Sequence, residues 1–165
     1  DNFLFSDTIA RNIAFGDRKV NLRAVKRAAI QADVDSNITQ FQLGYDTVLG
    51  ERGVTVSGGQ KQRISIARAL MKDAPILILD DSVSAVDTKT ERAILSNLRQ
   101  TRQGKTTILI AHRISTIEQM DKVLFIDEGK MAGFGTHEEL YANNAAYRRM
   151  VDLQRLEEEG GKVNA

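Results

Sequence analysis

The sequence predicts an α/β protein, in which a mostly helical first part precedes a part that contains a parallel sheet. Over roughly the first seventy residues, apolar side chains recur at helical spacing behind residues that cap helices well. After Pro75, the only proline, continuous apolar runs alternate with helical segments. Because this alternation is typical of parallel strands joined by helices, the second part is expected to hold the sheet.

The first part is expected to begin with two short helices. Ser6 or Asp7 is suited to cap a helix that continues to about Phe15 and ends at Gly16. Asn21 is suited to cap the second helix. The inward face of this second helix is expected to hold four apolar residues, namely Leu22, Val25, Ala28 and Ala29.

A longer helix is expected to end the first part. A third short helix over about residues 35–41 precedes it, and glycines at 44, 50 and 53 then break the pattern into loop. Ser57 opens the longer helix, since Gln60 three residues on completes a capping box. Its apolar residues follow at helical spacing: Ile64, Ala67, Leu70 and Met71.

The second part alternates strands with helices. Residues 76–79 are a continuous apolar run, which predicts a strand buried on both faces. Residues 88–100 are expected to form a helix and residues 106–111 a second strand. The helix is expected to turn three residues inward: Ile94, Leu95 and Leu98.

The rest of the chain is expected to form a hairpin followed by helices. Residues 123–126 and 131–134 flank a hairpin-like turn at 127–130. Thr136 and Glu139 make another capping box, and a helix over about residues 144–158 closes the fold. The glycine-containing tail, residues 160–165, is expected to be disordered.

Composition excludes several classes of protein. A net charge of +1 gives no electrostatic footprint for nucleic acid. The absence of cysteine excludes disulfides and thiolate metal sites. No apolar run approaches the roughly 20 residues needed to span a bilayer. The chain begins without a methionine or a signal peptide, so we expect that it was cut from a longer one.

A glycine-led helix start at residues 56–60 is the first candidate for nucleotide chemistry. Gly58 and Gly59 let backbone N–H groups approach an anion closely, and the helix dipole favours negative charge there. Ser57 adds a hydroxyl donor. A capped helix without a ligand is the alternative, and the carboxylates that follow argue against it.

Polar side chains end both apolar strands of the second part. Asp80 is suited to hold Mg²⁺, directly or through water, and Asp81 to polarise an attacking water. His112 is suited to hydrogen-bond a γ-phosphate or that water. The alternatives are a helix-capping Asp pair and a histidine bonded to the backbone. An expected position of His112 beside Asp80 favours the functional interpretation.

A complete phosphate loop is missing from the chain. No Gly-x-x-x-x-Gly-Lys-Ser/Thr string occurs in the 165 residues. The string Gly-Lys-Thr-Thr at 104–107 imitates its end, but Arg99 stands where the first glycine belongs. The string also leads into a strand, whereas a phosphate loop leads into a helix, so we expect an ordinary turn there.

These motifs in this order resemble the nucleotide-binding domain of exporter-type ABC transporters over nearly the whole chain. Residues 56–60, Val-Ser-Gly-Gly-Gln, resemble the signature motif, and residues 76–80 the Walker B strand. Residues 84–87 resemble the D-loop, and His112 the switch histidine. Residues 50–53 resemble the loop that touches the transmembrane domains, and residues 135–140 another frequent exporter string.

The resemblance implies a partial P-loop NTPase (RecA-like) core with the ABC α-helical subdomain. The subdomain would span residues 1–73 and the C-terminal half of the core residues 74–159, with Asp1 just after the glutamine of the Q-loop. ATP and Mg²⁺ are the implied cofactors. The implied site residues are Asp81 and His112 for catalysis, Asp80 for the metal, and Ser57, Gly58, Gly59, Gln60 and Asp87 for the nucleotide.

One departure from the family concerns Asp81, where the catalytic carboxylate is normally Glu. Asp is one methylene shorter, and a misplacement of about 1 Å costs on the order of 10²-fold in rate. Such a chain resembles the degenerate-site subunit of a heterodimeric exporter. The implied partners are transmembrane domains of the same transporter and a second nucleotide-binding domain, with no nucleic acid, at the cytoplasmic face of the membrane.

Two other classes of function remain open from the sequence. One is a soluble ABC-type ATPase of DNA repair or translation, and the other is a non-catalytic interaction module. Residues 2–6 and 12–16 resemble the exporter segment that faces the coupling helices, which favours the transporter. The sequence upstream of Asp1 would decide between these classes, since six membrane spans there would indicate the exporter.

Overall fold

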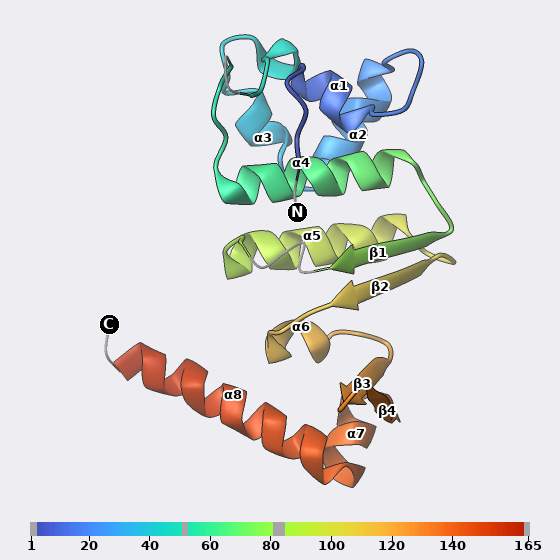
Figure 1. Cartoon of the computed structure of the whole chain (residues 1–165), viewed down its shortest axis with the longest axis vertical. Coiled ribbons are helices and arrows are strands. Elements are labelled where there is room, and N and C mark those ends of the chain that lie inside the picture. The colour runs from blue at the N-terminus through green and yellow to red at the C-terminus, as the bar shows by residue number, and fades with distance from the viewer. Residues whose placement is uncertain (1–2, 51–52, 81–84, 164–165) are drawn as a thin grey trace. The chain divides into compact units, whose positions relative to one another are not determined.

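The computed structural model describes residues 3–50, 53–80 and 85–163 of the chain, with side chains described as far as Glu157. It divides into two compact units, Asp1–Ile110 and Ala111–Ala165, which are described separately below. Figure 1 labels their helices and strands.

The first unit begins with a group of short helices packed on a long one. The short helices are α1 (Ile9–Ile13), α2 (Leu22–Gln31), α3 (Asp35–Ile38) and the 3₁₀ helix η1 (Gly44–Asp46), and the long one is α4 (Gly58–Met71). Their apolar faces form a buried core that includes Ile9, Ile13, Val25, Val34, Ile38 and Ile64. In Figure 1, α4 separates this helical group from the strands of the unit.

The caps explain where these helices begin. Asn21 caps α2, as predicted, because its Oδ1 accepts the N–H of Ala24 at 3.2 Å. The prediction for α1 was wrong by one or two residues, because Thr8 is its cap and accepts the N–H of Arg11 at 3.1 Å. Asp7 instead accepts the N–H of Thr8 at 2.7 Å. Leu22 at the start of α2 is 46% exposed, so it does not belong to the inward face.

The strands of the first unit form a parallel pair. β1 (Ile76–Asp80) pairs with β2 (Thr106–Ile110), and α5 (Thr88–Thr101) connects them, which confirms the predicted strand–helix–strand alternation. Gly104, with φ +75°, makes the turn between α5 and β2, so the string at 104–107 is no phosphate loop. As predicted, α5 buries Ile94, Leu95 and Leu98.

The prediction that the first strand is buried on both faces was wrong. Leu77 and Leu79 are buried, whereas Ile76 and Ile78 are 57% and 61% exposed. Ile108 and Ile110 of β2 are exposed as well. Within the described residues this sheet has two strands, and it is covered on one face only.

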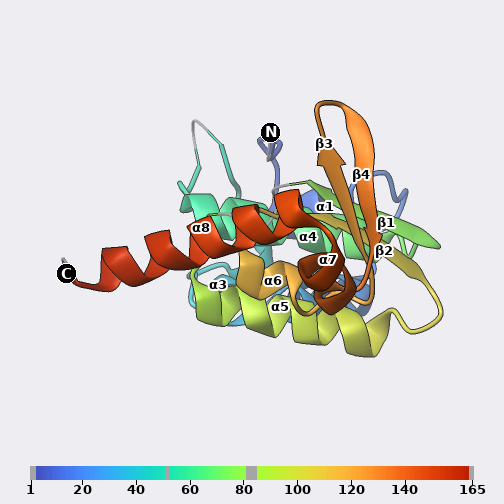
Figure 2. The same ribbon diagram turned by 90° about the horizontal axis from the view of Figure 1, so that it is seen from below.

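The second unit contains a short helix, a hairpin and two further helices. They are α6 (Ile114–Ile117), β3 (Val123–Asp127), β4 (Lys130–Gly135), α7 (His137–Asn143) and α8 (Ala145–Val163). Figure 2 shows the paired strands of the hairpin. Glu128 and Gly129 both have positive φ and make its turn, as the sequence predicted. The unit is centred on four buried residues, Ile114, Leu140, Tyr147 and Val151.

Two features of the second unit concern its helices. The predicted capping box of Thr136 and Glu139 is present at the start of α7. The sequence predicted that the last helix ends at about Glu158. α8 instead continues through Gly160 and Gly161 to Val163. Within the ranges that the structure describes, no helix is both long and apolar enough to cross a membrane.

Candidate functional site

The start of α4 presents backbone donors on an exposed surface. Ser57 is the cap, and its Oγ accepts the N–H of Gln60 at 3.2 Å while Gln60 Oε1 accepts the N–H of Ser57 at 2.9 Å. The N–H groups of Gly58 and Gly59 make no hydrogen bond to any residue that the structure describes. No heavy atom lies within 4 Å of the position a Gly58 Cβ would take. This helix start is therefore open to an anion.

A short segment after the first strand lies directly against this helix start. Ala85 donates its N–H to Gln62 Oε1 at 3.0 Å, and a Cβ on Gly59 would lie 3.1 Å from the Ala85 carbonyl oxygen. The close approach of another backbone thus favours glycine at position 59, apart from any ligand. In Figure 1, the start of α4 and the end of β1 lie on the same side of the first unit.

Asp87 ends that segment and caps α5. Its Oδ1 accepts the N–H groups of Lys89 and Thr90, both at 3.0 Å, and its Oδ2 accepts the Thr90 hydroxyl at 2.8 Å. These bonds, foremost the Thr90 N–H, hold the pKa of Asp87 below its ordinary value. The carboxylate is therefore engaged in capping, and its contact with nucleotide stays a prediction.

Asp80 is the last residue of β1 and is exposed, and it pairs in register with Ile110 of β2. A carboxylate at the C-terminal end of a parallel strand is placed where such sheets bind ligands. One carboxylate suits Mg²⁺, which keeps several waters and takes its other ligands from phosphate. Among the described residues there is no group of three or more acidic or histidine side chains that could hold a metal without such help.

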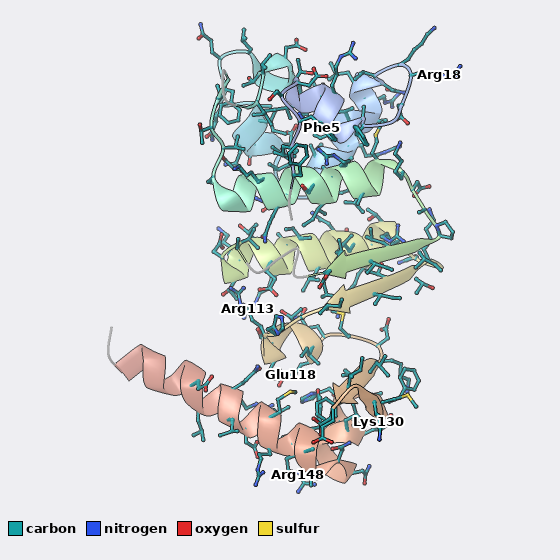
Figure 3. All side chains as sticks on the ribbon, in the orientation of Figure 1. Phe5, Arg18, Arg113, Glu118, Lys130 and Arg148 are labelled. Carbon is teal, nitrogen blue, oxygen red and sulfur yellow. The ribbon has the colours of Figure 1, made fainter. Side chains whose placement is uncertain are left out.

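The positions of the two predicted catalytic residues relative to this site stay a prediction. Asp81 lies outside the described residues. His112 is exposed and belongs to the second unit, just ahead of α6 and its cap Arg113. Its expected position beside Asp80 therefore stays a prediction. Figure 3 labels Arg113, and Glu118 at the other end of α6.

Two arginines that the sequence analysis missed hold α4 in place. Arg63 Nε donates to the Gly59 carbonyl at 3.2 Å, and its Nη1 donates to Asn37 Oδ1 at 2.9 Å and to the Asp33 carbonyl. One turn and a half later, Arg68 donates to the Asn12 carbonyl at 2.7 Å and to Asn12 Oδ1 at 2.9 Å. Burial lowers the pKa of the Arg68 guanidinium.

Arg68 also supports an exposed aromatic cluster made of Phe3, Phe5 and Phe15. The rings of Phe5 and Phe15 stack with centroids 4.6 Å apart, and Phe3 meets Phe5 edge-on at 5.0 Å. The Arg68 guanidinium lies 5.3 Å from the Phe5 ring centre and 5.5 Å from that of Phe15. Figure 3 labels Phe5 beside α1 and α4. Exposed aromatic residues grouped in this way are typical of interaction surfaces.

Comparison with known proteins now identifies the family. The family model described as "ABC transporter" matches residues 1–84. The chain is 49% identical over 163 residues to the probable multidrug resistance ABC transporter ATP-binding/permease protein YheI of Bacillus subtilis, covering 98% of this chain and 28% of that protein. It is 48% identical over 160 residues to an ATP-dependent lipid A-core flippase of Aromatoleum aromaticum, covering 94% and 26%.

A solved structure supports the same assignment. A bacterial Atm1-family ABC exporter with ATP bound matches with a TM-score of 0.86 at 44% identity, over 92% of this chain and 26% of that one. The chain therefore belongs to the ABC transporter family, as part of a nucleotide-binding domain of the exporter type, and its predicted fold class is confirmed. It spans about a quarter of the length of these relatives (26–28%).

Proposed function

We propose that this chain is part of the ATP-hydrolysing motor of an exporter, in which it supplies the signature helix start and the metal-binding end of the Walker B strand. The observation that carries the proposal is the start of α4. Two unengaged glycine N–H groups stand there, next to a serine whose hydroxyl keeps its own proton to donate. Such a cradle suits the phosphates of ATP.

The residues of the site divide the work of hydrolysis. Ser57, Gly58, Gly59 and Gln60 would bind phosphate oxygens by backbone and side-chain donors. Asp80 would hold Mg²⁺, which neutralises charge on the phosphates when it is bound. Asp81 would accept a hydrogen bond from the attacking water, and His112 would donate one to the γ-phosphate. The water's oxygen would bond to the γ-phosphorus and give one proton to the Asp81 carboxylate. The bond from that phosphorus to the β–γ bridging oxygen would break, and ADP would leave with its electron pair.

The partners follow from two features of the chain. The exposed aromatic cluster suits a docking surface for the transmembrane domains, because apolar rings are held outward by the fixed guanidinium of Arg68. A second nucleotide-binding domain is needed to supply the phosphate loop that faces this chain's signature. The shortened carboxylate at Asp81 favours a heterodimer, in which the partner carries Glu at that position and its site turns over faster.

The test is the ATPase activity of the full-length protein, measured with and without Mg²⁺, for the wild type and two variants. Asp80→Asn should lower Mg²⁺-dependent turnover by about 10²-fold or more, because the metal loses its charged ligand and ATP at this chain's own site then no longer holds the two nucleotide-binding domains together around the faster site. Asp127→Asn is the matched control, since it changes a carboxylate that ends another strand, and its turnover should stay within about twofold. Full activity of Asp80→Asn, or none in the wild type, contradicts the proposal.

A soluble ATPase and a non-catalytic module remain the competing functions. No described feature of the chain favours either one over the exporter, and the exposed aromatic cluster argues for a partner at that surface. Hydrolysis by the full-length protein without attached membrane-spanning segments would indicate the soluble class. Binding of a partner without any hydrolysis would indicate the interaction module.

A further inference from the structure

Gln62 stands on the inward side of α4, one turn after the glycines. Only 6% of its surface is exposed, so its polar head is not at the surface to meet solvent. The head instead reaches another segment of the chain, because Gln62 Oε1 accepts the N–H of Ala85 at 3.0 Å. Buried polar side chains nearly always have a hydrogen-bond partner, and the Ala85 N–H is one partner of Gln62.

The carbonyl group of Ala85 also lies close to α4. The Ala85 carbonyl oxygen lies 3.1 Å from the position that a Cβ of Gly59 would take, and Val86 Cγ1 lies 3.5 Å from it. Gly58, one residue earlier, meets nothing within 4 Å. The two glycines therefore have different surroundings: Gly58 faces open space, and Gly59 is covered by the Ala85 backbone and the Val86 side chain.

The covering segment is fixed at its far end as well. Val86 is 6% exposed, and Asp87 caps α5 through Lys89 and Thr90. On the other side of α4, Arg63 holds the Gly59 carbonyl at 3.2 Å. The peptide units around Gly59 thus lie between a fixed guanidinium and residues 85–87, so the position of the open N–H groups depends on both.

We propose that Gln62 is a positioning residue for ATP hydrolysis, which holds residues 85–87 and the start of α4 in one fixed arrangement. The proposal rests on the proposed function, because it assigns a role to the helix start that binds phosphate. Donors preorganised for a transition state lose most of their effect when they shift by about 1 Å, which costs on the order of 10²-fold in rate. Gln62 does not touch the nucleotide in this account, and it acts through Ala85.

The chemical requirement is an acceptor of the right length at position 62. Methionine has nearly the same length and volume as glutamine but cannot accept the Ala85 N–H well. Glutamate has the same length and keeps an oxygen acceptor, and the cost of burying its charge is read separately from the thermal midpoint of the variant. The pair Gln62→Met and Gln62→Glu therefore separates loss of the hydrogen bond from loss of packing.

The experiment measures steady-state ATPase of the full-length protein over a range of ATP concentrations, with the thermal midpoint of every variant. Gln62→Met should lower kcat by about 10- to 100-fold with KM changed less than about threefold, and Gln62→Glu should stay within about threefold of the wild-type kcat. Asn97→Leu is the matched control. Asn97 donates to the Gln31 carbonyl at 3.1 Å, so the variant removes a helix-to-helix hydrogen bond far along α5 from residue 87. It should lower the thermal midpoint with kcat within about twofold.

Wild-type kcat in Gln62→Met would overturn the proposal, and so would an equal loss in Gln62→Met and Gln62→Glu. Ser57→Arg is measured alongside. An inactive Ser57→Arg with a fully active Gln62→Met leaves the proposed function standing and overturns this inference alone, whereas a fully active Ser57→Arg overturns both. If Gln62→Met does not fold, Gly59→Ala decides, because its Cβ would press on the Ala85 carbonyl. It should lower kcat, and an unchanged kcat would overturn the proposal.

Discussion

Replacement of Arg68 tests how the N-terminal segment is held on α4. Arg68→Met keeps the apolar stem of the side chain but removes the guanidinium, which donates to two oxygens of Asn12 at 2.7 and 2.9 Å. Asn12 is only 1% exposed, so water cannot replace these bonds without the segment opening. A third bond, to the Phe3 carbonyl at 2.9 Å, is exposed and contributes less.

The magnitude follows from those two bonds. A hydrogen bond that involves a charged group contributes about 1.5 to 3 kcal/mol, so losing two into a buried residue costs about 3 to 6 kcal/mol of local stability. Since each 1.4 kcal/mol corresponds to a tenfold change, amide protection in the segment should fall roughly 10²- to 10⁴-fold. The amides to watch are those of Phe5, which donates to Asn12 Oδ1 at 2.8 Å, and of Asn12, which donates to the Thr8 carbonyl at 2.9 Å.

The assay is hydrogen exchange of the full-length protein, followed by mass spectrometry of peptides that cover residues 3–15. Arg68→Lys should fall between the wild type and Arg68→Met, because an ammonium cannot reach both oxygens as a fork does. Arg99→Met is the control, since Arg99 is an exposed arginine on α5, and exchange in residues 3–15 should not change. A loss of protection below about threefold in Arg68→Met would refute the reasoning.

Three further predictions concern the isolated chain. Because it contains no phosphate loop, it should bind ATP only in the millimolar range, roughly −4 kcal/mol or weaker, and should not hydrolyse ATP at a transporter-like rate. Micromolar binding in a calorimetric titration would contradict this prediction. The isolated chain should also self-associate through the exposed apolar residues of its strands, which are Ile76, Ile78, Ile108, Ile110, Leu124, Ile126, Met131 and Phe134. Light scattering that gives a clean 18.3 kDa monomer would argue against this prediction. The Thr136 N–H, and next the charge of Lys122, hold the pKa of Glu139 below its ordinary value. The stabilisation of α7 by this carboxylate is therefore present above the ordinary carboxyl pKa and is lost as the pH falls through the lower folded pKa. Hydrogen exchange of the α7 amides, measured from neutral to acid pH, should show this loss of stability in the wild type. The same pH dependence in a Glu139→Gln variant would contradict the assignment of the loss to Glu139.

Features set by neighbours in the chain could be predicted from the sequence. The capping boxes at Ser57 and Thr136 each join residues three apart, so the sequence alone indicates them. The hairpin turn at Glu128 and Gly129 is equally local. The order of the motifs also indicated the family, since motifs are recognised from residue identity and not from contacts.

Features set by distant residues could not be predicted. Arg68 meets Asn12 across 56 positions of the chain, and Ala85 meets Gln62 across 23. The residues that neighbour Arg68 and Gln62 in the sequence do not indicate these distant partners. The burial of β1 was predicted wrongly for a related reason: an apolar run favours a strand, but what covers each face depends on elements elsewhere. The signal that could have raised interest in Gln62 is its place on the buried side of the signature helix.

The most direct test of the central claim compares two variants of the full-length protein. In the proposed function, Ser57→Arg would place a bulky cation at the helix start that faces the faster ATP site, and Asp81→Asn would remove a carboxylate that is already one methylene short. The measurement is steady-state ATPase activity. The account predicts a loss of about 10²-fold or more for Ser57→Arg and less than about tenfold for Asp81→Asn. Equal inactivation by both would contradict the unequal sites and make Asp81 a working catalytic base in a symmetric homodimer.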